Sequence, residues 1–242
     1  MRYIMKRYLL LLLVLTLSFA ATFAADESTI TIKTSKPVGT SVSLDAYTSS
    51  KDEAFTVDWG DGEEKIYNID PNGWGYSRRI NTEIKGGTIT IKGKLVNLDL
   101  TKAGITSIEL HGQTAMKVIN LKENEIATFA QDGMPALTEL NLRDNKLTKF
   151  TGTGMTSLKT LNLQGNQLDS HELDITDASA TLTELNVSDN GDKFINLNLM
   201  PFTALEYFYC DDNPEFTTAV FADNNENIRK ISMNNCHVMH FY

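Results

Sequence analysis

The clearest pattern in the chain is an alternation of apolar and polar residues that returns every 21 to 24 positions. The copies read LVNLDLTKAGI (95–105), MKVINLKENEI (116–126), LTELNLRDNKL (137–147), LKTLNLQGNQL (158–168), LTELNVSDNGD (182–192), LEYFYCDDNPEF (205–216) and IRKISMNNCHV (228–238). Such alternation predicts one half-buried strand per copy. Because a single short strand cannot bury its own apolar face, the copies are expected to stack into a parallel sheet over one continuous core.

This pattern resembles the leucine-rich repeat, L-x-x-L-x-L-x-x-N/C-x-L, over residues 95–238. The resemblance implies a mainly β, right-handed solenoid of about seven repeats, occupying residues 94–242. A buried turn after each strand needs hydrogen-bond partners, and an Asn amide supplies both donors and an acceptor. The expected ladder consists of Asn124, Asn145, Asn166, Asn190, Asn213 and Cys236, with Ala103 interrupting it in the first copy.

The segments between the predicted strands are short and lack helical periodicity, so the solenoid is expected to curve only weakly. Phe129 aligns with Phe150 and Met134 with Met155, which predicts that these segments place side chains in the core. The longest segment, residues 169–181, is expected to carry an extra turn.

Residues 25–93 contain no repeat and predict a small antiparallel β domain. Its strands are expected at STITIK (28–33), TSVSLDAY (40–47), AFTVDW (54–59), KIYNI (65–69) and GTITIKG (87–93), with a turn at DPNGWG (70–75). The last strand runs almost directly into the first repeat. The domain is therefore expected to cap the solenoid and to form one rigid unit with it.

The stretch FTVDWGDGEE (55–64) allows three interpretations: a carboxylate pair, a calcium loop, or a turn. Phe55, Val57 and Trp59 alternate inward, Asp61-Gly62 is a strong hairpin signal, and Ile66 is expected to resume the inward pattern. The turn is favoured because nothing supplies a second wall for a catalytic cleft. WGDG also resembles the GDG turn of PKD-type β-sandwiches, and a calcium site remains the alternative.

The N-terminus places Arg2, Lys6 and Arg7 before an apolar run and then small residues, the order of a signal peptide over residues 1–24. The protein is therefore expected to be exported to the periplasm, the cell surface or the medium, with no membrane span after cleavage. The formal charge is −9, and cleavage would remove three positive charges. An acidic chain repels phosphate groups, which argues against a nucleic-acid partner.

No cofactor, metal or catalytic motif is recognisable. His171-Glu172 lacks the second His of a zinc-binding helix, and no Ser or Cys stands in a nucleophile context. Cys210 and Cys236 occupy different repeat positions, roughly 10 Å out of register along the chain, which is beyond the reach of a disulfide. Two free, buried thiols are expected.

The outward positions of the predicted strands define a candidate binding surface. One row contains Asp99, Asn120, Asn141, Asn162, Asn186, Tyr209 and Ser232, and the row beside it contains Asn97, Val118, Glu139, Thr160, Glu184, Tyr207 and Lys230. The proposed ligand-binding residues are Tyr207, Tyr209, Asp211, Lys230, Asn162 and Asn186. Tyr combines an apolar ring with a hydroxyl and is enriched in binding sites. Alternatively, the C-terminal tail with Phe241 and Tyr242 covers both rings.

The leading functional hypothesis is a noncatalytic scaffold that binds a protein or a glycan on the inner face of the repeat sheet. The resemblance is its main support, since repeats of this kind generally bind on that face. A structural or envelope-associated assembly protein is the second hypothesis, and a hydrolytic enzyme is the third.

Overall fold

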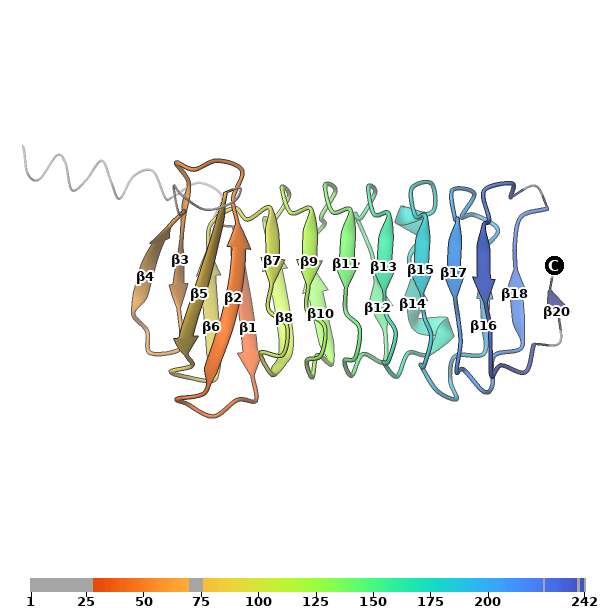
Figure 1. Cartoon of the computed structure of the whole chain (residues 1–242), viewed down its shortest axis with the longest axis horizontal. Helices are drawn as coiled ribbons and strands as arrows, with labels where there is room; N and C mark the ends of the chain where they lie inside the picture. Colours follow the sequence, from red (N-terminus) through yellow and green to blue (C-terminus); the bar gives the residue numbers. More distant parts are fainter. Residues whose placement is uncertain (1–27, 70–75, 224, 239, 242) are drawn as a thin grey trace, which may run out of the picture.

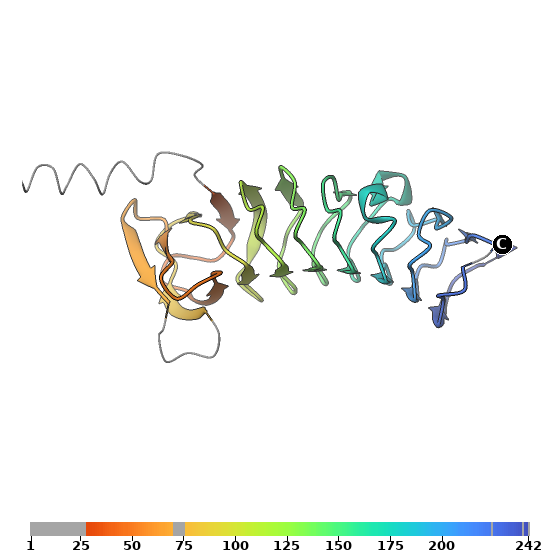
Figure 2. The same ribbon diagram turned by 90° about the horizontal axis from the view of Figure 1, so that it is seen from above.

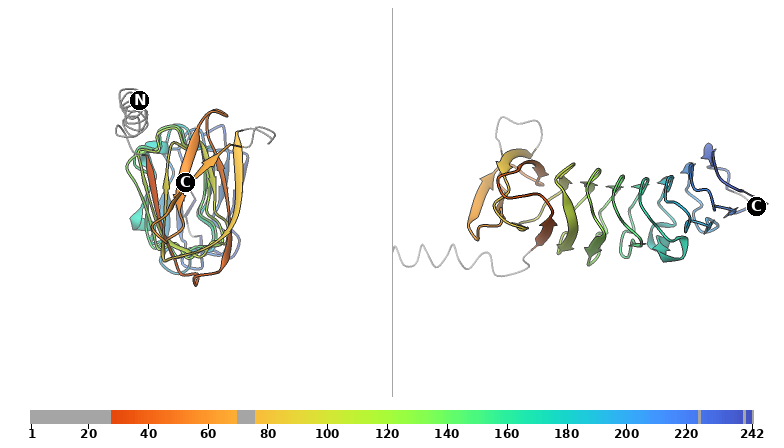
Figure 3. Two further views of the ribbon diagram at one scale, coloured as in Figure 1. Left: turned by 90° about the vertical axis from the view of Figure 1, so that its left-hand side faces the viewer. Right: turned by 90° about the horizontal axis from the view of Figure 1, so that it is seen from below.

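A computed structural model of the protein describes residues 28–69, 76–223, 225–238 and 240–241; the predicted signal peptide and the turn at 70–75 lie outside them. The described chain winds into an elongated β-solenoid whose axis is nearly straight in two perpendicular views (Figure 1, Figure 2). Viewed along that axis, the coils overlie one another in one flattened outline (Figure 3). The mainly β fold, the parallel repeat sheet and the weak curvature expected from the sequence are confirmed.

Each repeat contributes one short strand to the nine-stranded sheet at the front of the solenoid. These strands are β7 (Asn97–Asp99), β9 (Val118–Asn120), β11 (Glu139–Asn141), β13 (Thr160–Asn162), β15 (Glu184–Asn186), β17 (Tyr207–Tyr209) and β19 (Lys230–Ser232). Neighbouring strands pair without a register shift, so that Leu140 lies between Ile119 and Leu161. These middle residues are buried. The two flanking residues of each strand therefore face outward and form two rows.

The return segments form the back of the solenoid and are partly extended. β8 (Ile105–His111) pairs with β10 (Thr128–Gln131), β12 (Phe150–Thr151) with β14 (Leu173–Asp174), and β16 (Asn196–Asn198) with β18 (Thr218–Val220), which also pairs with β20 (His240–Phe241). Met134 and Met155 are buried, and the ring centroids of Phe129 and Phe150 are 6.0 Å apart. The expectation that these segments fill the core is confirmed.

Residues 169–181 contain the predicted extra turn as two 3-10 turns, η1 (Ser170–Glu172) and η2 (Thr176–Ala178). Asp169 caps η1 by accepting a hydrogen bond from the His171 N–H at 3.0 Å. Across the described ranges no helix has the length and apolar character needed to cross a membrane.

The strands that precede the repeats extend both sheets. β1 (Thr29–Thr34) lies between β6 (Thr88–Lys92) and β8, and β3 (Ala54–Asp58) and β4 (Glu64–Asn68) complete this six-stranded sheet. β2 (Ser41–Tyr47) pairs with β7 on one side and with β5 (Ser77–Glu83) on the other. Ile30, Leu44 and Trp59 belong to the same core cluster as the repeat leucines. Both sheets therefore cross the predicted domain boundary near residue 93.

Two details of this N-terminal part differ from the sequence prediction. Strand β5 was not predicted, because Ile80 is its only buried residue and alternation is therefore absent. The prediction that Ile66 resumes the inward pattern is wrong: its side chain is 71% exposed. Tyr67 packs inward in its place, with its ring 5.8 Å from that of Phe55.

The WGDG stretch is a turn held by its own carboxylates, in agreement with the favoured interpretation. Asp58 Oδ1 accepts hydrogen bonds from the N–H groups of Gly60 at 2.8 Å and Gly62 at 3.0 Å. Asp61 forms an ion pair with Lys85, whose hydrogen bond holds the pKa of Asp61 below its usual value. The Trp59 carbonyl accepts from the N–H groups of Lys85 and Gly86, which ties the turn to the loop before β6.

The row of amides that follows the front strands joins successive coils. Asn124, Asn145, Asn166, Asn190 and Asn213 are all buried. Asn145 accepts from the Ile126 N–H at 2.9 Å and donates to the carbonyls of Leu121 at 3.0 Å and Leu142 at 2.9 Å. One amide thus satisfies backbone groups of its own coil and of the coil before it.

Cys236 ends this row at the C-terminal side, and Cys210 lies in the core beside it. Both are free thiols, and burial raises the pKa of the Cys210 thiol far above its usual value. The Cys236 thiol donates to the Cys210 carbonyl at 2.9 Å. The expectation of burial is correct for Cys210 but wrong for Cys236, which is half-buried because no further coil of the described residues covers it.

Replacing Asn145 with Ala is expected to lower the free energy of unfolding by about 1–3 kcal/mol, because three buried backbone groups lose their partner. Asn141→Ala is the matched control, since Asn141 is only half-buried and stands on the front face. Urea denaturation of both variants measures the difference. If both variants lose the same free energy of unfolding, the assignment of Asn145 to the interior and Asn141 to the outer face is wrong.

Candidate binding face

The outward residues of the front sheet form two unbroken rows that include the N-terminal strands. The amide row is Arg79, Asp45, Asp99, Asn120, Asn141, Asn162, Asn186, Tyr209 and Ser232. The mixed row is Ser77, Tyr47, Asn97, Val118, Glu139, Thr160, Glu184, Tyr207 and Lys230. The seven repeat positions of each row lie in the register that the sequence predicts.

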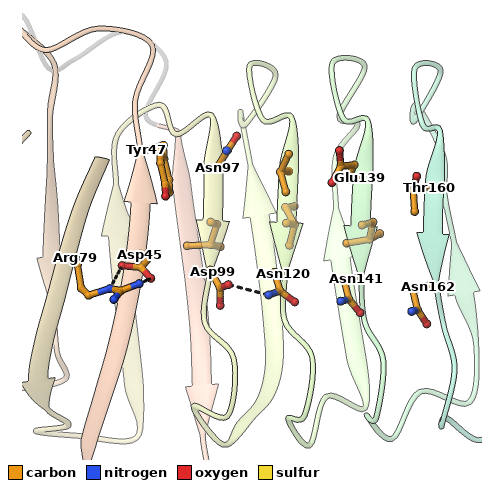
Figure 4. A pocket seen from close by; sticks show the side chains of 14 residues that line it. Asp45, Tyr47, Arg79, Asn97, Asp99, Asn120, Glu139, Asn141, Thr160 and Asn162 are labelled. Atoms are coloured by element: carbon orange, nitrogen blue, oxygen red, sulfur yellow. Dashed lines mark hydrogen bonds and ion pairs between the residues drawn. The ribbon is translucent and has the colours of Figure 1, made fainter. Parts of the chain in front are cut away.

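A groove of about 520 Å³ lies on this face where the N-terminal strands meet the first four repeats. Figure 4 shows side chains of both rows standing out from the strands around it. Leu98, Ile119 and Leu140 also line the groove, although their side chains are buried. Backbone atoms therefore form the floor between the rows, and polar side chains form most of the walls.

The charged groups at the N-terminal end of the groove are already engaged. Arg79 donates from Nε to Asp45 Oδ1 and from Nη2 to Asp45 Oδ2, both at 2.7 Å (Figure 4). This bidentate pair raises the pKa of Arg79 above its usual value. Asp99 accepts from Asn120 Nδ2 at 2.7 Å and from the Thr101 N–H at 2.9 Å.

The amides further along the row are oriented by the backbone. The Oδ1 atoms of Asn141 and Asn162 accept from the N–H groups of Arg143 and Gln164, both at 3.1 Å, and Asn186 Oδ1 accepts from Ser188 N–H. These Asx turns fix which end of each amide carries the donors. Asn120 differs: its Nδ2 turns to Asp99, and its buried Oδ1 has no hydrogen-bond partner in the described chain.

The proposed ligand-binding residues fall into two groups. Asn162 lines the groove, and Asn186 occupies the next strand outside it. Tyr207, Tyr209, Asp211 and Lys230 gather at the C-terminal end of the face, where Lys230 Nζ lies 4.8 Å from the centroid of the Tyr209 ring. Asp211 is engaged there by Ser232 Oγ at 2.8 Å.

The alternative that the tail covers these tyrosines does not fit the backbone. Residues 240–241 form β20, which pairs with β18 in the back sheet. Tyr207 and Tyr209 stand on the front sheet and are partly exposed. Tyr242 lies outside the described residues.

Sequence reasoning missed the N-terminal wall of the groove, formed by Asp45, Tyr47 and Arg79. The alternation in SVSLDAY did place Asp45 and Tyr47 on one strand face, opposite Leu44 and Ala46. What the sequence did not reveal is the pairing of this strand with the first repeat.

The site can hold a ligand by hydrogen bonds and by contact with the Tyr47 ring. Within the described ranges no three His, Cys, Asp or Glu side chains converge on a position that could hold a metal ion. Asp45 and Asp99 already accept short hydrogen bonds, which favours roles in shaping the groove.

Comparison with protein-family models finds leucine-rich repeats in the middle of the chain. Residues 135–177 match the model described as Leucine Rich repeats (2 copies), and residues 178–191 match one described as Leucine Rich repeat. No curated protein and no solved structure matches the chain. The chain therefore contains leucine-rich repeats, in a solenoid that its own strand pairing defines.

Proposed function

We propose that the leucine-rich repeats of this chain form a noncatalytic scaffold that binds a protein or a glycan through the front face. The observation that carries the proposal is the pair of unbroken outward-facing rows, mostly polar, which span nine strands and contain a groove. Leucine-rich repeats are commonly protein-binding scaffolds, which supports a binding role. Residues 1–24 support a location outside the cytoplasm, as part of the same proposal.

The face is suited to binding because it is open and preordered. The strands that line the middle of the face are paired on both sides, and the Asn141 and Asn162 amides are held by backbone hydrogen bonds. A ligand therefore meets groups that lose little conformational entropy on binding.

A matched pair of double variants tests which face binds. Asn141→Arg with Asn162→Arg places two bulky cations in the groove. Asn196→Arg with Asn198→Arg makes the same chemical change on β16 of the back sheet, where both residues are exposed. The measurement is binding of the full chain to arrays of glycans and of purified proteins. Every interaction seen with the unmodified chain is expected to weaken at least about tenfold in the front variant and to persist in the back variant.

The opposite pattern, loss only in the back variant, would contradict the proposal, as would a chain that binds neither array. Melting temperatures of both variants establish that they fold. The variant Tyr207→Ala with Tyr209→Ala then separates the two ends of the face: it weakens binding only if the ligand reaches beyond the groove.

A further inference from the structure

We propose that the groove binds a neutral oligosaccharide, held by Tyr47, Glu139, Asn141 and Asn162. This inference rests on the proposed function, because it names the ligand class of the same face. It is carried by the pattern of uncommitted donors and acceptors, by the absence of deep apolar contacts, and by the charge of the groove.

The free hydrogen-bonding groups match the hydroxyl groups of a sugar. The backbone N–H of Glu139 donates to the Lys117 carbonyl, but its carboxylate has no ion-pair or hydrogen-bond partner within the described part of the chain. An ionised carboxylate can only accept hydrogen bonds. Asn141 uses its Oδ1 on the Arg143 N–H, so its Nδ2 donors remain available. The two residues stand on one face of β11, about 6–7 Å apart along the strand. A sugar hydroxyl both donates and accepts, so adjacent hydroxyls of one ring can use both groups.

The same arrangement recurs on the neighbouring strand. Thr160 and Asn162 on β13 lie directly beside Glu139 and Asn141. Asn162 Oδ1 is likewise bonded to the backbone, at 3.1 Å from the Gln164 N. β11 and β13 thus each offer one amide donor, at paired positions of the two strands, and one side-chain oxygen two residues before it. A polymer of hydroxylated rings lying across the strands meets a repeated set of partners.

Tyr47 supplies the aromatic contact. It is half-buried on β2 and stands at the end of the groove beside Asn97 (Figure 4). A Tyr ring offers an apolar face to the C–H groups of a sugar and a hydroxyl to its rim.

The charges of the groove favour a neutral glycan over an anionic one. Asp45, Asp99 and Glu139 line the groove, and its one cation, Arg79, is neutralised by Asp45. Carboxylated or sulfated sugars would meet this negative potential. The groove is also poorly suited to a basic peptide, which would need several free carboxylates as partners. Glu139 is the only carboxylate of the groove without a partner in the described residues.

The apolar contacts expected of a protein hot spot are also scarce. Leu98, Ile119 and Leu140 contribute backbone but not side chains, because each is only 1% exposed. Val118 is the one aliphatic side chain of the two rows that faces the groove. Protein interfaces concentrate their energy in desolvated aromatic and aliphatic anchors, which this floor does not provide.

The test is calorimetric titration of the full chain with β-linked glucose, mannose and xylose hexasaccharides, with an oligogalacturonate as the anionic comparison and hexalysine as the cationic peptide. At least one neutral hexasaccharide is expected to bind, and the oligogalacturonate is expected not to bind. Tyr47→Ala, Glu139→Ala and Asn141→Ala should each weaken binding about tenfold or more. Asn198→Ala is the matched control, because Asn198 makes the same backbone hydrogen bond, to the Met200 N–H at 3.1 Å, on the back sheet.

Binding that is unchanged in the three groove variants would overturn the inference, as would failure of all three neutral sugars to bind. If only hexalysine binds, and Glu139→Ala abolishes that binding, the ligand class is wrong while the front face remains the binding face. If binding of any probe depends on Asn198 instead, the proposed function fails as well.

Discussion

Replacement of Gly60 with Ala is expected to destabilise the protein by about 3 kcal/mol or more. Gly60 adopts φ +105°, a conformation that side chains with a Cβ rarely adopt. An added Cβ would lie 2.5 Å from both the N and the Cα of Gly86, so two backbone segments would have to separate. These are the segments joined by the Trp59 carbonyl hydrogen bonds.

Gly62→Ala in the same turn is the control for this experiment. Gly62 also has a positive φ, +79°, but an added Cβ meets no atom within 4 Å. Gly62→Ala should therefore lower the free energy of unfolding only through the unfavourable backbone conformation, by about 1–2 kcal/mol. Urea denaturation midpoints of both variants give the comparison. If Gly60→Ala costs no more than Gly62→Ala, the close approach to Gly86 has no structural importance.

Removal of residues 1–93 is expected to leave residues 94–242 insoluble or markedly less stable. The deletion takes away β1, the antiparallel partner of β8, and β2, the antiparallel partner of β7. Leu98, Ile105 and Ile108, all buried in the intact chain, would lose much of their cover. A domain is stable by only about 5–15 kcal/mol in total. Exposing this much of the core to water is therefore expected to remove a large part of the free energy of unfolding.

Thermal unfolding of residues 26–242 and of residues 94–242 tests this expectation. A second measurement uses the longer chain alone. Both tryptophans, Trp59 and Trp74, precede residue 94, so fluorescence reports on the N-terminal part while far-UV circular dichroism reports on all strands. The two unfolding curves should coincide, because both sheets continue across the junction. A soluble fragment 94–242 with an unchanged melting temperature would show that the N-terminal strands are not needed as a cap.

The repeats could be predicted in detail because every copy carries the same local information. Alternation fixed which face of each strand is buried, and the constant spacing aligned Asn141 with Asn120 and Asn162. The Asn ladder follows from the same argument, since a buried turn in each coil needs the same donors and acceptor.

The N-terminal wall of the candidate groove could not be predicted in this way. It depends on the pairing of Asp45 with Asp99 and of Asp45 with Arg79, residues separated by 54 and 34 positions. Local periodicity does not encode such pairings. β5 also lacks a local signal, because an edge strand with one buried residue needs no alternation. The exposed Ile66 shows the opposite case, an apolar residue in a strand that points away from the core.

The two 3-10 turns have a consequence for how this architecture can change in size. The coil that begins at Leu158 is three residues longer than the coil before it, and η1 and η2 lie in its return segment. β13 and β15 nevertheless pair in the common register. Extra residues in a return segment therefore lie at the back of the solenoid and leave the pairing of the front strands unchanged. Duplication of a whole coil would instead lengthen the front face by one strand spacing, about 4.8 Å. A gene that gains or loses repeats would therefore change the reach of this protein in equal steps, without altering the geometry of the positions it already has.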